Sequence, residues 1–128
     1  MPRVSYMTTH MGFASPFPEM QVLGTKLAAE YGLLLPRAAR SLGHLYGSTD
    51  SGEARARKIA ERLETLEPGT WILLDHAALD TPEMRAIHHP GYENVATDRA
   101  AVMESWTSGK VKDVIRRRQI QVVGHVSR

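Results

Sequence analysis

Two histidines stand where a parallel α/β fold would place functional side chains. His10 follows the apolar stretch of residues 4–8, and His76 follows residues 70–74, the clearest strand pattern in the chain. In parallel α/β folds, ligands gather at the carboxyl ends of the strands. A histidine there can bind a metal ion or move a proton, or it can simply hydrogen-bond a loop. The sequence therefore identifies both histidines as candidate functional residues and does not decide between these roles.

The other polar residues carry weaker signals. The chain has six histidines, which are His10, His44, His76, His88, His89 and His125. None is spaced three or four residues from another, as two metal ligands on one helix would be. Asp75 precedes His76, but neighbouring strand residues point to opposite faces, so the two side chains need not converge. The basic tract of residues 110–118 would suit phosphate, yet we favour a solvated helix end because the helix dipole attracts basic residues there.

Strands and helices alternate along the chain. Four apolar stretches predict strands, at residues 4–8, 33–35, 70–74 and 120–123. Helices are predicted from Pro18 to a stop at Gly32, after the loop of residues 47–52, from Thr81 and Pro82, and over residues 97–106 and 108–117. Trp71 is assigned to the core. This order predicts an α/β domain over residues 1–128, with a mostly parallel sheet and flanking helices.

Composition narrows the functional classes. The 128 residues are 42% hydrophobic and 23% charged, as in a globular protein. The chain has no cysteine, which suits a cytoplasmic protein, and its formal charge of +2 gives no argument for a nucleic-acid partner. No stretch approaches the roughly 20 apolar residues that span a bilayer, so no membrane partner is expected.

Several motifs, in order, resemble one protein family. They are residues 8–12 (TTHMG), 27–33 (LAAEYGL), 76–87 (HAALDTPEMRAI), 91–93 (GYE) and 120–124 (IQVVG). This pattern is similar to the second half of the YdjC-like carbohydrate deacetylases, which are related to chitooligosaccharide deacetylases. The resemblance implies half of a barrel-like (β/α) fold and the hydrolysis of N-acetyl groups on a sugar or oligosaccharide. It further implies a divalent metal, Mg²⁺ or Zn²⁺, with His10 as a metal ligand and His76 as a catalytic residue of the site.

Departures from the family pattern bear on activity. Thr8 occupies the position of an acidic residue in the family motif, Ala77 replaces a proline, and no Asp-Asp pair occurs in the sequence. A hydroxyl cannot act as a carboxylate ligand or base. We therefore expect little or no deacetylase activity from this chain alone. The alternative is a non-catalytic carbohydrate-binding or structural remnant of the same fold.

A half-barrel leaves a sheet edge without a partner strand. Such an edge is normally covered, and a two-fold dimer would cover it with the same surface from a second copy. The apolar residues expected there are Val4, Tyr6, Ile120 and Val122. The competing expectation is a monomeric open sandwich with an edge shielded by residues 47–52.

Overall fold

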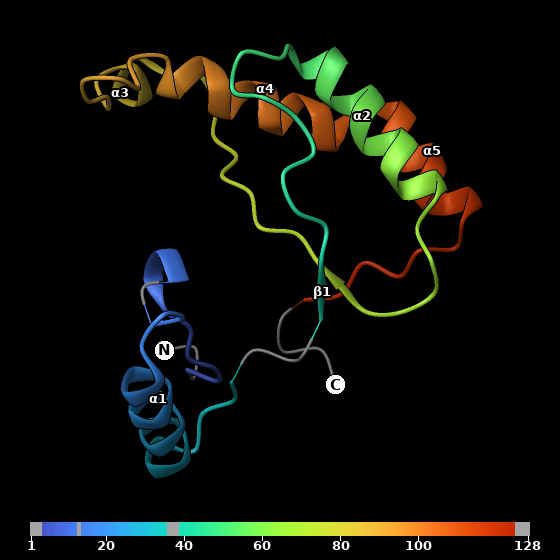
Figure 1. Cartoon of the computed structure of the whole chain (residues 1–128). Coiled ribbons are helices and arrows are strands. Elements are labelled where there is room, and N and C mark those ends of the chain that lie inside the picture. Colours follow the sequence, from blue (N-terminus) through green and yellow to red (C-terminus); the bar gives the residue numbers. More distant parts are fainter. Residues whose placement is uncertain (1–3, 13, 36–38, 125–128) are drawn as a thin grey trace. The chain divides into compact units, whose positions relative to one another are not determined.

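The computed structural model describes residues 4–12, 14–35 and 39–124. The chain divides into two compact units. Unit 1 comprises Met1–Ala38 and Val122–Arg128, and unit 2 is the continuous stretch Ala39–Gln121. Figure 1 traces the elements of each unit along the chain. Among the described residues, no helix has both the length and the apolar character that a membrane crossing needs.

Unit 1 is organised around one helix. A 3₁₀-helix, η1 (His10–Gly12), precedes α1 (Pro18–Tyr31), which begins with proline in its first turn. Gly32 follows in the left-handed conformation (φ 63°), and the amide of Leu33 donates to the carbonyl of Ala28 at 2.8 Å. Proline can start a helix because its missing N–H has no intrahelical partner there, and glycine tolerates a positive φ at the stop. The predicted bounds of this helix are confirmed.

The two strands expected in unit 1 are reduced to one parallel bridge. Tyr6 pairs with Leu34, and the amides of Leu34 and Met7 donate to Ser5 and Leu34 carbonyls, each at 2.9 Å. The two stretches therefore lie side by side, but the hydrogen-bonded ladder does not extend beyond this bridge within the described part of unit 1.

Unit 2 combines helices with a small parallel sheet. Its strands are β1 (Arg40–Ser41) and β2 (Trp71–Ile72), with Arg40 opposite Trp71. The Arg40 and Leu42 amides donate to the Thr70 and Ile72 carbonyls at 3.1 and 3.0 Å. A mixed α/β composition is thus present, with two paired residues where the sequence predicts the five-residue strand 70–74.

Three helices form the core of unit 2. Helix α2 (Gly52–Glu64) packs against both α4 (Val95–Thr107) and α5 (Gly109–Arg117), as Figure 1 shows. The sequence predicts an apolar face of Ala56, Ile59, Ala60, Leu63 and Leu66 here. This face is confirmed, because the first four lie in the buried cluster and Leu66 packs against it. That cluster consists of Ala56, Ile59, Ala60, Leu63, Val111 and Val114. Complete burial of a side chain such as Ile59 contributes about 1.5–3 kcal/mol.

Side-chain caps start α2, α3 (Pro82–Arg85) and α5 of unit 2, whereas α4 has no such cap. The hydroxyls of Ser51, Thr81 and Ser108 accept hydrogen bonds from the amides three residues later, at 3.2–3.3 Å, at the starts of α2, α3 and α5. Such caps satisfy amides that have no intrahelical acceptor. The helix start predicted at Thr81 and Pro82 is confirmed, although α3 lasts only four residues.

The last predicted strand is wrong. Residues 120–123 form no strand. Helix α5 ends in a turn in which Gln119 takes a positive φ of 52°, and the Ile120 amide donates to the Ile115 carbonyl at 2.9 Å. The Ile120 side chain packs against the helical core. Its apolar character is therefore explained by contact with helices and not by a sheet.

Candidate functional site

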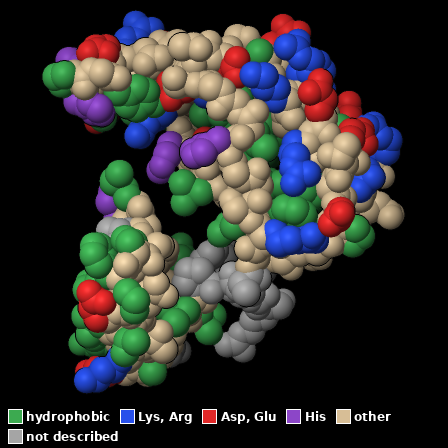
Figure 2. All heavy atoms as spheres, viewed as in Figure 1, with side chains coloured by type: hydrophobic (Ala, Val, Ile, Leu, Met, Phe, Trp, Pro, Cys, Tyr) green, Lys and Arg blue, Asp and Glu red, His purple; other side chains and the backbone are tan. Residues whose placement is uncertain are grey.

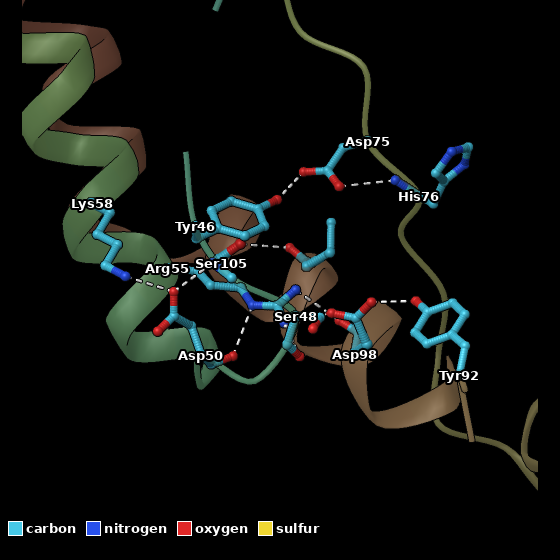
Figure 3. A network of polar contacts seen from close by, with 12 residues as sticks. Tyr46, Ser48, Asp50, Arg55, Lys58, Asp75, His76, Tyr92, Asp98 and Ser105 are labelled. Carbon is cyan, nitrogen blue, oxygen red and sulfur yellow. Dashed lines mark hydrogen bonds and ion pairs between the residues drawn. The ribbon is translucent and has the colours of Figure 1, made fainter. Parts of the chain in front are cut away.

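Asp75, three residues beyond β2, is the centre of a polar cluster. Its Oδ2 accepts hydrogen bonds from the Tyr46 hydroxyl and from Trp106 Nε1, the latter at 2.9 Å. Its Oδ1 accepts the His76 backbone N–H at 3.0 Å. Tyr46 follows β1 and Trp106 lies on α4, so three separate segments meet at one carboxylate. Figure 3 shows the Tyr46 hydroxyl directed at Asp75. The cluster lies beyond the carboxyl ends of two parallel strands, where α/β folds bind ligands.

Tyr46 serves this cluster as a neutral hydrogen-bond donor. Burial, the hydrogen bond to Asp75 and the negative charge of Asp75 raise the pKa of Tyr46 well above its ordinary value. The hydroxyl therefore keeps its proton at neutral pH, because the phenolate would be both poorly solvated and close to a carboxylate. Asp75 in turn has most of its acceptor capacity occupied.

A buried arginine contacts the Tyr46 ring of this cluster. Arg55 of α2 is 1% exposed, and its guanidinium carbon lies over the Tyr46 ring, 4.8 Å from the centroid. Its N–H groups donate to the carbonyls of Ser48, Asp50 and Asp98 at 2.8–3.0 Å and to Asp98 Oδ1 at 2.5 Å. Figure 3 shows Arg55 between the loop that precedes α2 and the first turn of α4. A buried charge persists only when it is paired in this way.

Asp98 extends the network to the turn that precedes α4. Its Oδ2 accepts the Tyr92 hydroxyl. Burial, this hydrogen bond and the Asp98 charge raise the pKa of Tyr92. Tyr92 also forms an isolated antiparallel bridge with His89, and their rings meet edge to face at 5.8 Å. A chain of contacts thus links Tyr92 to Asp75. It runs from Tyr92 to Asp98, then to Arg55, then to Tyr46 and finally to Asp75.

His76 is exposed, and its only hydrogen bond to Asp75 is made by its backbone N–H. Figure 3 shows the imidazole turned away from the Asp75 carboxylate. The two neighbours therefore do not form a carboxylate–imidazole pair, as the alternation of strand side chains allowed.

His10 lies in the other unit, at the start of η1, and is exposed. Thr8 and Thr9, which precede it, line an open pocket of about 330 Å³ together with Met20, Gln21 and other residues of unit 1. His10 is not one of the residues that line this pocket. His10 and His76 belong to different units, and their convergence on one site stays a prediction. His125 lies outside the described residues.

The donor groups do not fit a divalent metal ion. Within residues 4–12, 14–35 and 39–124, no three His, Cys, Asp or Glu side chains come together in a group that could hold one. Thr8 supplies a hydroxyl where the family motif has a carboxylate. Glu93, close to His88 and His89, has its pKa lowered by the amides of Gly91 and Glu93 and then by these histidines, but it forms no ligand group with them. We therefore derive no chemical step through a metal.

Comparison of the chain with protein-family models, curated proteins and solved structures finds no match. The resemblance to YdjC-like deacetylases therefore depends on the quoted motifs alone.

Sequence reasoning missed most of the cluster around Asp75. Tyr46, Trp106 and Asp98 approach Arg55 or Asp75 from positions 29–43 residues away in the chain. One signal was present but was not used. Arg55 stands four residues before Ile59 and next to Ala56, so its place on the apolar face of α2 could have indicated burial. A charged residue on such a face must have partners, and these can be sought among the loop carbonyls and carboxylates.

Proposed function

We propose that this chain is a YdjC-like carbohydrate-binding module, built as half of a barrel-like (β/α) fold, which binds an acetylated sugar and does not hydrolyse it by itself. The order of the family-like motifs supports the fold and the ligand class. The observation that carries the binding site is the fixed Asp75 cluster beyond the carboxyl ends of β1 and β2, with the exposed His76 ring beside it.

The groups around His76 suit an amphipathic ligand. Two leucines that flank His76 in the sequence are exposed, Leu74 to 80% and Leu79 to 64%, and they supply apolar surface. A sugar presents C–H surface together with hydroxyl and amide groups, and small-ligand sites commonly combine apolar contacts with a few fixed polar groups. The His76 ring nitrogens can exchange hydrogen bonds with a sugar hydroxyl or with the N-acetyl amide.

The same groups are poorly suited to hydrolysis. Asp75 accepts three hydrogen bonds, which occupy the oxygens that would take a proton from water. The raised pKa of Tyr46 keeps that residue protonated. His76 has no carboxylate to orient its ring, and a general base has to be held within hydrogen-bond reach of the proton it removes. The arrangement therefore favours binding over turnover.

The test is a titration of the ¹⁵N-labelled protein with tri-N-acetylchitotriose, followed by NMR. We expect amide shifts in residues 73–80 and an affinity that falls at least about fivefold in His76→Ala, from the loss of one or two hydrogen bonds. His88→Ala, which removes another exposed histidine of unit 2, is the matched control and should bind normally. The fully deacetylated trimer should bind more weakly than the acetylated one.

An acetate-release assay on the same oligosaccharide separates binding from catalysis. We expect no release above background. Release that a chelator abolishes would establish the chain as a metal-dependent deacetylase and overturn the non-catalytic proposal. Absence of any saturable shift with the oligosaccharide would overturn the carbohydrate site itself.

We also propose that the chain forms a homodimer through Val4, Tyr6 and Val122, the residues named for the open edge whose side chains are exposed. The exposure of Val4 (72%) and Val122 (77%) supports a covered surface in the assembly. Light scattering at micromolar concentration should give about twice the 14.2 kDa of one chain. A mass of one chain that stays constant on concentration would contradict the dimer.

A further inference from the structure

A second group of interacting side chains surrounds Trp71, at the start of β2. The guanidinium carbons of Arg40 and Arg62 lie over its ring, 4.2 and 5.1 Å from the centroid. Trp71 Nε1 donates to the Glu67 carbonyl at 3.0 Å, which fixes the ring. Trp71 is therefore half-buried beneath arginines and does not lie in the hydrophobic core, contrary to the sequence prediction.

Three arginines from three elements converge on residues 66–71. Arg40 of β1 donates to the Pro68 carbonyl at 2.6 Å, and Arg118, at the end of α5, donates to the Leu66 carbonyl at 2.7 Å. Arg62 reaches Trp71 from the last turn of α2. A Cβ at position 69 would lie 2.4 Å from Arg40 Nη2, so glycine leaves the room that this guanidinium occupies. The glycine at position 69 thus allows Arg40 to pack closely against this turn.

Three carboxylates near these arginines are already paired. Glu67 pairs with Arg40 at 3.0 Å. Glu64 pairs with Arg117 and Asp113 with Arg116. Arg62 and Arg118 have no carboxylate within 4.0 Å in the part of the chain that the structure describes.

Two arginines without a carboxylate partner therefore lie against residues 66–71, Arg62 on the Trp71 ring and Arg118 on the Leu66 carbonyl. Figure 2 shows Lys and Arg side chains, interspersed with acidic ones, over the end of unit 2 formed by α2 and α5. An excess of positive charge held at fixed positions favours an anionic ligand.

We propose that Arg62 and Arg118, together with Trp71, form a binding site for the phosphate or sulfate group of an anionic ligand. A guanidinium stacked on an aromatic ring keeps its in-plane N–H groups available, and these match the oxygens of a tetrahedral oxyanion in pairs. Contact with the Trp71 ring also restricts the Arg62 side chain, so less rotamer entropy is lost when the anion binds. This site is separate from Asp75 and His76 and does not depend on the carbohydrate proposal.

The test uses inorganic phosphate and sulfate, added to ¹⁵N-labelled protein at constant ionic strength with chloride as the balancing anion. We expect saturable shifts of the Trp71 indole N–H and of arginine Nε–H signals, with the Trp106 indole unchanged. Arg62→Gln and Arg118→Gln should each weaken binding at least about fivefold, as expected for loss of a charge-assisted hydrogen bond. Arg57→Gln removes the same charge from an exposed position of α2 and should weaken binding less than about twofold.

Two further arms identify the role and the source of the anion. Arg118 also donates to the Leu66 carbonyl, so its removal could disturb the fold as well as the site. Arg118→Lys keeps the positive charge, and circular dichroism of each variant shows whether the fold is intact. A sugar phosphate that binds as tightly as the free ion would show that the site accepts an esterified group, whereas binding of the free ion alone would identify an inorganic anion as the ligand. Shifts that chloride reproduces, or equal losses in Arg57→Gln and Arg62→Gln, would overturn the site and leave these arginines as helix-end charges.

Discussion

Units 1 and 2 differ in how they use their apolar residues. In unit 2, the side chains of Ile59 and Val111 are fully buried where α2 meets α5. In unit 1, Ala14 and Ala28 are the only buried residues among those described, while Val22 and Tyr31 of α1 are each 70% exposed. Helix α1 is nevertheless as long as α2. Local start and stop signals are sufficient to define a helix in both units, but only unit 2 adds the burial that makes a helix stable.

This difference predicts where the stability of the chain resides. Unit 2 contains both an apolar core and the buried Arg55 network, so substitutions there should change the global free energy of unfolding. Substitutions in unit 1 should change local opening more than global unfolding, because fewer buried contacts depend on them.

The largest effect is expected from Arg55→Leu. It leaves Asp98 and three loop or helix carbonyls without their donor, and breaking a buried ion pair in this way costs about 3–5 kcal/mol. Urea unfolding followed by circular dichroism measures the change. Arg57→Leu, at an exposed position two residues later, is the control and should cost less than about 1 kcal/mol. Equal losses for the two variants would contradict a special role for Arg55.

The next effect compares the two units directly. Ile59→Ala should lower the free energy of unfolding by about 2–4 kcal/mol, through lost burial and a cavity between α2 and α5. Leu23→Ala, on the exposed side of α1, should cost less than about 1 kcal/mol. Both are measured by the same urea titration. A larger loss for Leu23→Ala would mean that α1 is buried in the native protein.

Alkaline pH should weaken unit 2 through Tyr46. The folded protein keeps the Tyr46 proton at pH values where the unfolded chain loses it, because burial and Asp75 raise the pKa of this tyrosine. The stabilisation is complete below pH about 10 and is lost as the pH rises further, at up to about 1.4 kcal/mol per pH unit for one group. Tyr46→Phe should therefore reduce the loss of stability between pH about 9 and about 11. Tyr31→Phe, at an exposed tyrosine of α1, should leave that loss unchanged.

The smallest effects are expected at two glycines of α1, and they have opposite signs. Gly32→Ala places a Cβ on a left-handed residue and should destabilise α1 by about 1 kcal/mol. Gly24→Ala adds helix propensity where the new Cβ meets only Met7 at an ordinary 3.7 Å, and it should stabilise α1 by about 0.5–1 kcal/mol. Amide hydrogen exchange in α1 reads out both changes. Matching shifts in α2 would show that the units do not open separately.

Helices could be predicted from the sequence because their signals are local. Pro18, Gly32 and Thr81 each mark an end that the structure confirms. Strands could not be bounded in this way, because a strand exists only where a partner supplies hydrogen bonds. Residues 70–74 pair over two positions with β1, which had not been predicted, and residues 120–123 do not pair as a strand. The same apolar pattern can therefore serve a sheet or, as at Ile120, a helical core.

The candidate site shows the same limit. Asp75 and His76 could be named from their place after a strand, whereas the partners of Asp75 come from Tyr46 and Trp106, which no spacing rule relates to it. The roles of His10 and His76 stay predictions, since they were inferred from family-like motifs.

Unit 2 is one uninterrupted stretch, and unit 1 includes residues from both sides of it. During translation, β1, α2, β2, α4 and α5 are all synthesised before residues 122–124. Domains tend to fold as units, and the buried contacts among α2, α4 and α5 require no residue beyond position 121. Unit 1, in contrast, includes residues that are synthesised after the whole of unit 2.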